Sequence, residues 1–382
     1  MKKLLTLAVL AVAGWAAYAV FWPSSFEPQA WNPPPLADAE AAFADSGDLS
    51  GETRMAHGVA EGPEDVASDA QGRLYAGYAD GTIRRFDADG GDSEVFATTN
   101  GRPLGLAFAE GPVPRSEEAD SGDGENSEDG GDRADQTLIV ADADKGLLAI
   151  DAEGDITVLA SGADGTPFAF TNDVDVAENG QIYFSDASSR YGQTDYRTDL
   201  LEHGGHGRLL KYDPASGRTT VLLGGLQFAN GVAVGPDDAY VLVVETGSYR
   251  ICRYWLTGDR AGQSDIFINN LPGFPDGLSF DGEGTFWLAL FAPRDPLLDF
   301  AADKPWLRAI VHDLPRELQP QPAHVGHVIG LDTDARVIAN LRDAGDRAFA
   351  PITSVERVGD SLYLGSLTAP AFARIRVPDA GR

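Results

Sequence analysis

One pattern repeats along this chain, and the repeat limits the possible folds more than any other feature. The stretch "FTNDVDVAENGQIYFSD", residues 170–186, contains a polar pair, a short alternating strand, a turn and a second strand. The same layout recurs in "GPEDVASDAQGRLYAGY", "FANGVAVGPDDAYVLVVE" and "FPDGLSFDGEGTFWLAL". A fixed repeat of this kind decides the fold before composition is considered.

From about residue 58 the repeat can be counted in pairs of strands. Second strands are predicted at "GRLYAGY", "TLIVADA", "QIYFSDA", "YVLVVET", "TFWLALF" and "SLYLGSL", each followed by a third strand. A fourth strand follows the first five copies, and the chain ends before a sixth. Four-stranded units at this interval are typical of β-propellers. The sequence therefore predicts an all-β, six-bladed β-propeller over residues 51–382.

The predicted ring needs one more strand to close. We expect the last blade to take it from the segment before Gly62, around "ETRMAHGV". Two β-sandwiches would be an alternative, but they do not explain why the same polar position recurs. The 44 Gly and 23 Pro residues fit many short strands joined by tight turns. The single cysteine, Cys252, lies in the apolar strand "SYRICRYW" and is expected to be a small core residue.

The N-terminus is predicted to be separate from the propeller. Lys2 and Lys3 precede an uncharged run, residues 4–22, which is close to the ~20 residues that span a bilayer. The positive-inside rule then places the propeller outside the cytoplasm. The alternative is a cleaved signal peptide, because "AYA" at residues 17–19 resembles a cleavage site, and the protein would then be secreted. Residues 1–22 are thus an anchor or signal segment, and residues 23–50 read as a linker.

The polar positions of the repeat share one phase. Taking the residue two places before the first inward apolar residue of each opening strand gives Glu64, Leu104, Asn172, Asn230, Asp276 and Pro351. Four of these six carry side-chain oxygens. The innermost strand of every propeller blade starts at the same face of the central channel, so these side chains should converge. Asn-Gly and Asp-Gly are also ordinary turn dipeptides, but a turn does not explain Glu64 in the same phase.

Two carboxylates and two amide carbonyls are the hard oxygen ligands that Ca²⁺ prefers. Zinc is disfavoured, because His203 and His206 lie among glycines without convincing further ligands. The next residue of the repeat is aspartate in two copies, Asp65 and Asp173. These two aspartates either hold a second, structural calcium deeper in the channel or are solvated or hydrogen-bonded.

The connecting loops indicate which face is functional. Residues 189–207 and 292–327 are long insertions between second and third strands, and loops of that kind return to the predicted metal face. Both insertions should therefore cover the metal. The acidic stretch of residues 110–135 falls between a first and a second strand and is expected to be a disordered loop on the opposite side. A formal net charge of -30 argues against a nucleic-acid partner.

Several motifs in order resemble one known family. "GPEDV", "GRPLGLAF", "TNDVDV", "GRLLKYDP", "GLQFANGVAV", "ETGSYRICRYWLTG" and "INNLPGFPDGLSFD" resemble the strictosidine synthase-like branch of six-bladed calcium propellers, which includes adipocyte plasma membrane-associated proteins. Gluconolactonases (SMP-30) and paraoxonases are more distant relatives. The resemblance implies a calcium ion at the top of the channel, held by Glu64, Asn172, Asn230 and Asp276. It places Asp65 and Asp173 where paraoxonases hold a second calcium.

The chain departs from this family pattern at three positions. Gly277 stands where paraoxonases carry an asparagine after the ligand aspartate. Leu104 lies near the position of a histidine implicated in paraoxonase catalysis. Plant strictosidine synthase uses a catalytic glutamate near the opening strand of the last blade, where this chain has Ala350. The last departure argues against amine-aldehyde condensation.

The predicted activity is calcium-dependent hydrolysis of a small-molecule lactone or aryl ester. The general base is left open among Asp276, acting as both ligand and base, and His206 or His327 from the roof loops. A serine nucleophile is disfavoured because the chain has no Gly-x-Ser-x-Gly motif. The alternative function is a non-catalytic, membrane-tethered binding propeller in which calcium is structural.

Overall fold

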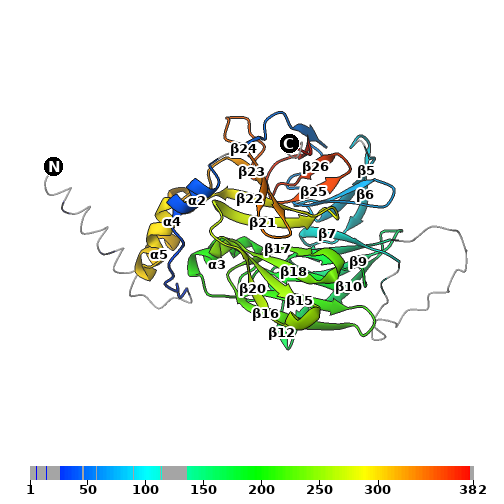
Figure 1. Cartoon of the computed structure of the whole chain (residues 1–382), viewed down its shortest axis with the longest axis horizontal. Helices are drawn as coiled ribbons and strands as arrows, with labels where there is room; N and C mark the ends of the chain where they lie inside the picture. Colours follow the sequence, from blue (N-terminus) through cyan, green and yellow to red (C-terminus); the bar gives the residue numbers. More distant parts are fainter. Residues whose placement is uncertain are drawn as a thin grey trace, which may run out of the picture.

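The fold is a closed ring of six antiparallel sheets, confirming the predicted six-bladed propeller (Figure 1). The computed structural model describes residues 6, 14, 26–44, 47–56, 58–88, 90–111, 113 and 136–378 of the 382-residue chain. Within each blade the strands follow one another in sequence from the channel outward. The innermost strands of neighbouring blades contact each other in cyclic order around the ring.

The first three blades run from β3 to β16. Blade 1 contains β3 (Val66–Ser68), β4 (Leu74–Gly77), β5 (Thr82–Phe86) and β6 (Ser93–Thr98). Blade 2 contains β7 (Pro103–Ala109), β8 (Thr137–Asp142), β9 (Gly146–Ile150) and β10 (Ile156–Ala160). Blade 3 contains β13 (Thr171–Val176), β14 (Ile182–Asp186), β15 (Gly207–Asp213) and β16 (Arg218–Leu226). A short hairpin, β11 (Gly162–Ala163) with β12 (Thr166–Pro167), precedes blade 3.

The last three blades complete the ring. Blade 4 contains β17 (Ala229–Val234), β18 (Tyr240–Glu245), β19 (Arg250–Trp255) and β20 (Ser264–Ile268). Blade 5 contains β21 (Gly273–Phe280), β22 (Thr285–Pro293), β23 (Gly326–Asp332) and β24 (Val337–Asp343). Blade 6 contains β25 (Val355–Val358), β26 (Ser361–Leu364), β27 (Phe372–Arg376) and, from the other end of the chain, β2 (Thr53–Met55).

The ring closes through the strand that the sequence predicts. β2 pairs antiparallel with β27, with Thr53 opposite Arg374 and Met55 opposite Phe372. A second N-terminal strand, β1 (Gly47–Asp48), pairs in parallel with β24 and makes blade 5 five-stranded. β1 is not predictable from the sequence, because two residues carry no detectable alternation.

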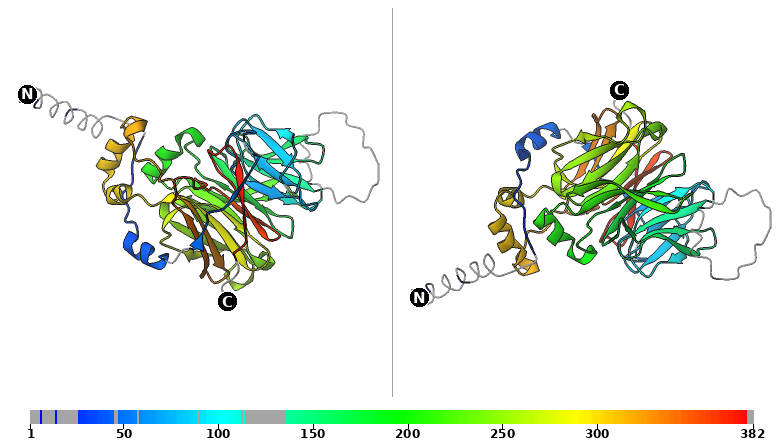
Figure 2. Two further views of the ribbon diagram at one scale, coloured as in Figure 1. Left: turned by 90° about the horizontal axis from the view of Figure 1, so that it is seen from above. Right: turned by 90° about the horizontal axis from the view of Figure 1, so that it is seen from below.

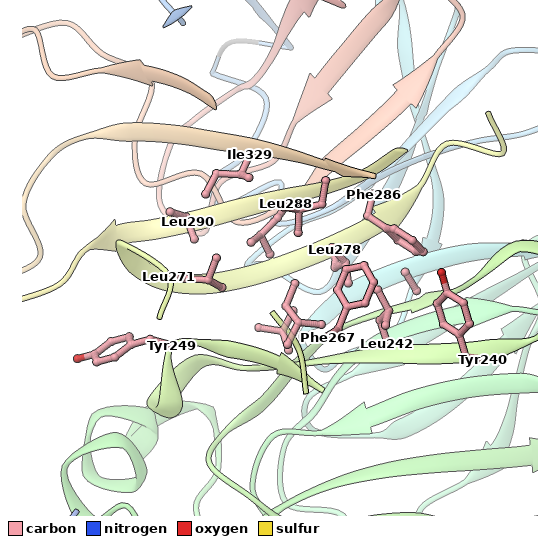
Figure 3. Packing of buried hydrophobic residues seen from close by; sticks show 14 residues of the cluster. Tyr240, Leu242, Tyr249, Phe267, Leu271, Leu278, Phe286, Leu288, Leu290 and Ile329 are labelled. Carbon is pink, nitrogen blue, oxygen red and sulfur yellow. The ribbon is translucent and has the colours of Figure 1, made fainter. Parts of the chain in front are cut away.

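The hydrophobic core lies between the blades. Each pair of neighbouring sheets encloses one apolar cluster, and the largest lies between blades 4 and 5 (Figure 3). There Leu242 and Phe286 are fully buried, and Phe267 packs edge-on against Phe286 with 5.7 Å between ring centroids. Burying one such side chain contributes about 1.5–3 kcal/mol. Cys252 is a buried free thiol in the cluster between blades 3 and 4, as predicted.

Helices gather at one end of the molecule (Figure 2). The insertion at residues 189–207 forms η2 (Gln193–Asp195) and α3 (Tyr196–Glu202), and the insertion at residues 292–327 forms α4 (Pro296–Ala301), α5 (Pro305–His312) and η6 (Arg316–Leu318). An N-terminal helix, α2 (Leu36–Ala42), lies near them. The remaining short 3-10 turns are η3 (Pro236–Asp238), η4 (Thr246–Ser248) and η5 (Gly258–Arg260).

Two sequence predictions fall largely outside the described residues. These are the apolar run at residues 4–22 and the acidic stretch at residues 110–135, apart from a few isolated positions. Within the part of the chain that is described, none of the helices has the length and apolarity needed to cross a bilayer.

Candidate metal centre and substrate cavity

The four predicted ligands meet at one end of the central channel. Glu64 precedes β3, Asn172 and Asn230 lie at the start of β13 and β17, and Asp276 lies within β21. Their exposed fractions are 7%, 6%, 4% and 7%. All four line the same cavity beneath the helices. The structure therefore brings together residues that are far apart in the sequence, as the shared phase predicts.

An irregularity in the sheet register recurs where the ligands are. The pairing of β13 with β14 shifts between Thr171 and Val174, and the pairing of β17 with β18 shifts between Ala229 and Val232. The same shift occurs in β21, between Pro275 and Leu278. A bulge of this kind re-aims a side chain that would otherwise stay in the ladder. Asn172, Asn230 and Asp276 lie within these three irregular stretches, whereas Glu64 precedes β3, whose pairing is regular.

The channel is narrow because the innermost strands approach closely. A Cβ atom on Gly231 would lie 2.5 Å from the backbone oxygen of Asp276, and one on Gly277 would lie 2.5 Å from the backbone oxygen of Thr353. Real Cβ atoms do not come that close to backbone atoms. Glycine after the ligand position thus lets three successive blades bring their side chains to one point.

The two carboxylates of the site are poorly stabilised by the protein alone. Burial raises the pKa of Glu64 well above its ordinary value, and the negative charges of Asp276 and Asp65 raise it further. Burial also raises the pKa of Asp276 to about 7, against a lowering contribution from its hydrogen bond with Asn230. Two buried like charges in one site favour a bound cation as their counter-charge.

Neighbouring side chains orient the amide of Asn230. Its Nδ2 donates to Thr246 Oγ1 at 3.2 Å and to Asp276 Oδ1. The Thr246 hydroxyl in turn donates to the backbone oxygen of Pro275 at 2.7 Å. Because the nitrogen is engaged on that side, the Asn230 carbonyl oxygen is left for a ligand. Thr246 was not predicted, since a single threonine after a strand carries no signal in the sequence.

These residues fit a calcium ion. The buried side chain of Glu64 lines both the polar channel and the cavity above it, where a cation could contact its carboxylate. The donor set is all oxygen, which suits Ca²⁺ and not a soft metal. Within the described chain no group of three or more His, Cys, Asp or Glu residues is arranged to hold a metal. That finding agrees with a site in which two of the four candidate ligands are amides.

The second pair of predicted ligands connects neighbouring blades. Asp65 accepts the backbone N–H of Leu106 in blade 2 at 2.9 Å, and Asp173 accepts that of Val232 in blade 4 at 2.7 Å. Each aspartate also accepts the N–H of the residue that follows it. The hydrogen-bonded alternative is therefore observed, and the second calcium stays a prediction.

Two further residues of the site were missed in the sequence. Thr353, not Pro351, occupies the shared phase in blade 6: its hydroxyl donates to the backbone oxygen of Glu64 at 2.7 Å, and it lines the cavity. Counting back two residues from Val355 would have found it. Arg102 lines the same cavity and is 4% exposed; its Nη1 donates to the backbone oxygen of Gly62. Its Nη2 has no partner within the described residues.

The two histidine candidates for the base lie elsewhere. His206 Nε2 is 3.2 Å from a carboxylate oxygen of Glu202, next to Tyr191. His327 is 4% exposed on β23, with Nε2 2.7 Å from Asn340 Oδ1, and burial lowers its pKa to about 4. Neither imidazole lines the cavity. Among the predicted bases, only Asp276 does.

The cavity above the channel has a volume of about 660 Å³ and is predominantly apolar. Its walls include Leu104 and Phe170 from the blades, Leu200 from α3, and Leu298 and Val311 from α4 and α5. Both long insertions contribute, so the predicted roof is observed. The residues of the channel itself enclose a smaller, polar space of about 150 Å³.

The N-terminal segment, read as a linker in the sequence, packs against this roof. Trp31 stacks on the His203 imidazole at 4.3 Å, and its backbone N–H donates to the oxygen of Ala302. The guanidinium of Arg294 donates to the backbone oxygen of Pro34 at 2.7 Å. Trp31 also lines the cavity. Residues 26–35, which we call the strap, therefore form part of the cavity wall.

The fold and the site together define a class: a six-bladed propeller with buried oxygen ligands at one end of its channel and an apolar cavity under a helical roof. Family models for strictosidine synthase and for the N-terminal part of strictosidine synthase-like proteins match residues 172–259 and 41–86. The chain is 35% identical over 326 residues to protein strictosidine synthase-like 6 of Arabidopsis thaliana, covering 84% of this chain and 80% of that protein. It belongs to the strictosidine synthase-like family.

One further relative supports the family assignment, and two solved structures share the fold. The chain is 32% identical over 327 residues to adipocyte plasma membrane-associated protein of Salmo salar, covering 82% of this chain and 75% of the relative. A gluconolactonase from Xanthomonas campestris has the same fold, with a TM-score of 0.57, 17% identity and coverage of 94% and 99% of the two chains. The calcium-binding protein regucalcin from Agrobacterium tumefaciens also has this fold, with a TM-score of 0.55 and 18% identity. The match covers 86% of this chain and 95% of regucalcin.

Proposed function

We propose that this protein is a calcium-dependent hydrolase of apolar lactones or aryl esters. The observation that carries the proposal is the position of four buried oxygen-bearing side chains at the floor of a large, mostly apolar cavity. A site of this type binds an apolar molecule and presents one polar group of it to a cation. The gluconolactonase and the calcium-binding protein of the same fold support this reading.

Glu64, Asn172, Asn230 and Asp276 would hold the calcium. Bound there, calcium would supply Lewis-acid polarisation of the substrate carbonyl and charge stabilisation for the developing oxyanion. Asp276 is the one predicted base that faces the cavity. We therefore assign it as the general base that accepts a proton from the attacking water. The unpartnered Nη2 of Arg102 in the cavity wall would donate to an oxygen of the reacting group.

The reaction is a balanced hydrolysis. The water oxygen bonds to the carbonyl carbon as Asp276 takes a water proton. The bond from this carbon to the alcohol oxygen then breaks, and the leaving oxygen receives the proton. The products are an acid and an alcohol, joined in one molecule when the substrate is a lactone. The apolar walls keep other water away from the reacting centre.

Turnover of a panel of lactones and aryl esters by the full chain in detergent tests this function. We expect hydrolysis with calcium, loss of hydrolysis in EDTA, and loss in Asp276→Asn while that variant stays folded. Thr246→Val is a useful second variant, because it removes the hydroxyl that orients Asn230 without removing a candidate ligand. Unchanged turnover in Asp276→Asn would contradict the assigned base.

A second candidate function is a non-catalytic binding module in which calcium only stabilises the channel. The observation in its favour is that no histidine lines the cavity within the described residues. Absence of turnover on every panel member, with calcium still raising the melting temperature, would favour this function over hydrolysis.

We also propose that the roof faces a membrane. The described chain resumes at Phe26, soon after the apolar run of residues 4–22, and the Phe26 ring stacks on His312 of α5 at 4.2 Å. The roof carries large apolar side chains that are highly exposed, namely Leu297 at 47%, Phe300 at 60%, Trp306 at 53% and Leu318 at 67%. Apolar side chains of this kind beside a membrane segment suit the interfacial zone of a bilayer. Relatives named adipocyte plasma membrane-associated protein are consistent with this placement.

A further inference from the structure

One buried cation in the roof of the cavity lacks a counter-ion. Arg308 lies on α5, is 3% exposed and lines the large cavity. Its Nη2 donates to the backbone oxygen of Gln29 in the strap. Its Nε has no hydrogen-bond acceptor, and no described carboxylate lies within ion-pair distance of its guanidinium. A guanidinium this buried is normally paired, because leaving a charge unpaired away from water is costly.

The carboxylate whose charge acts on Arg308, that of Glu202, is already bonded to other groups. Glu202 acts on Arg308 only at long range. Its own oxygens accept from Arg190 at 2.7 Å and from the hydroxyl of Tyr191, and they lie 3.2 Å from the ring of His206. Burial consequently lowers the pKa of Arg308 to about 10, which leaves it charged at neutral pH.

Another arginine of the same roof, Arg294, is paired with a carboxylate. Arg294 is 5% exposed and also lines the cavity. Its Nη2 lies 2.7 Å from the carboxylate of Asp299, and Nη1 donates to Asn270 at 2.8 Å. The roof therefore supplies a carboxylate to one buried arginine and leaves the other without one. In a chain with a net charge of -30, a general shortage of acidic residues does not explain the difference.

We propose that Arg308 is an anion-recognition residue and that the substrates of this cavity carry a carboxylate remote from the scissile carbonyl. This inference rests on the proposed hydrolase function and specifies its substrate class. The reacting carbonyl would lie at the channel floor near Asp276, and the apolar middle of the substrate would fill the cavity. The free carboxylate would reach the roof and complete the hydrogen bonding of the Arg308 guanidinium.

Two esters of matched size test the inference with the full chain in detergent and calcium. The para-nitrophenyl ester of octanoic acid ends in a methyl group, and the para-nitrophenyl hemiester of suberic acid ends in a carboxylate. We expect a higher kcat/KM for the hemiester. Arg308→Gln should reduce the ratio of the two values by about 10-fold to 100-fold, as expected for a hydrogen bond between charged groups. Arg308→Lys should retain part of the preference. Arg336→Gln, which removes a charge from an exposed turn, should leave it unchanged.

A binding measurement separates this inference from the hydrolase function. Suberate should raise the melting temperature of the calcium-loaded wild type more than octanoate does, and Arg308→Gln or Arg308→Lys should reduce that difference. If suberate shows this behaviour but neither ester is hydrolysed, the hydrolase proposal fails and the anion site stands. If both esters are hydrolysed with the same kcat/KM ratio in wild type and both Arg308 variants, the anion site is overturned and the hydrolase proposal stands.

Discussion

Asp173 in blade 3 accepts the backbone N–H of Val232 in blade 4 at 2.7 Å, so a side chain on one blade fixes the innermost strand of the next. Asp175 repeats this contact one step along the channel, accepting from Val234 at 2.7 Å. Asp65 forms the corresponding contact between blades 1 and 2. These carboxylates connect blades at the axis, where backbone N–H groups would otherwise lack acceptors.

Replacing one of these carboxylates by an amide should weaken the ring. We expect Asp173→Asn and Asp175→Asn each to lower the free energy of unfolding by about 1–3 kcal/mol in EDTA, because an amide nitrogen would face a backbone N–H. Guanidinium unfolding curves measure the loss, and wild-type stability in both variants would contradict it. An additional loss of unfolding free energy that appears only with calcium, and only in Asp173→Asn, would indicate that Asp173 binds the predicted second calcium.

The carboxylate of Glu64 should have opposite effects with and without calcium. In EDTA we expect Glu64→Gln to be at least as stable as wild type, because the change removes a buried charge whose pKa is raised by burial and by Asp276. With calcium the order should reverse, and the calcium dissociation constant should rise about 10-fold or more. Thermal unfolding across a calcium titration measures both effects. The same calcium-induced shift in wild type and variant would exclude Glu64 as a ligand.

The buried imidazole of His327 should make the folded protein less stable in acid. Burial lowers its pKa from 6.5 to about 4 in the folded protein, so between these values the unfolded chain binds the proton and the folded chain does not. The contribution of His327 to the free energy of unfolding is therefore fully present above about pH 6.5. It decreases as the pH falls toward 4, by roughly 3 kcal/mol in total. His327→Gln keeps a donor for Asn340 and does not titrate. The difference between the unfolding free energies of wild type and variant in EDTA should therefore change across this window, and parallel curves would refute the prediction.

The exposed apolar residues of the roof should bind lipid. A fragment comprising residues 26–382 is expected to float with phosphatidylcholine vesicles, and the double variant Phe300→Ser, Trp306→Ser should float less. The pair Ile156→Ser, Val158→Ser on β10 is a matched control, with exposed fractions of 38% and 56% on the outer edge of blade 2. Equal flotation of both double variants would contradict membrane binding. Sedimentation that shows the fragment to be a dimer formed through the roof would also contradict it.

Periodicity in the sequence predicted the blades and the four converging ligands because both repeat at fixed spacing. It also located the closing strand, since the sixth copy visibly lacks one. It misplaced the blade 6 position at Pro351 instead of Thr353, because that copy begins with an irregular stretch before β25. The same limit applies to Arg102 and Arg308, whose partners, or lack of them, depend on contacts between distant segments.

The strap shows a different limit of sequence reasoning. Its Pro-rich stretch "WNPPP" has no helical or strand period and resembles a linker by composition. Its position depends on partners in other parts of the chain, such as His203 beside Trp31 and Arg294 beside Pro34. Those partners are recognisable only once the two roof insertions have folded.

The pairing of β2 with β27 also has a consequence for biosynthesis. β2 is among the first parts of the propeller to leave the ribosome, and its partner strand is among the last. The ring therefore cannot close until β27 has been synthesised and has left the ribosome. Until then the unpaired edge of β2 and the apolar surfaces of blades 1 and 5 remain uncovered. A nascent chain of this protein thus passes through an open stage in which those edges have no native partner.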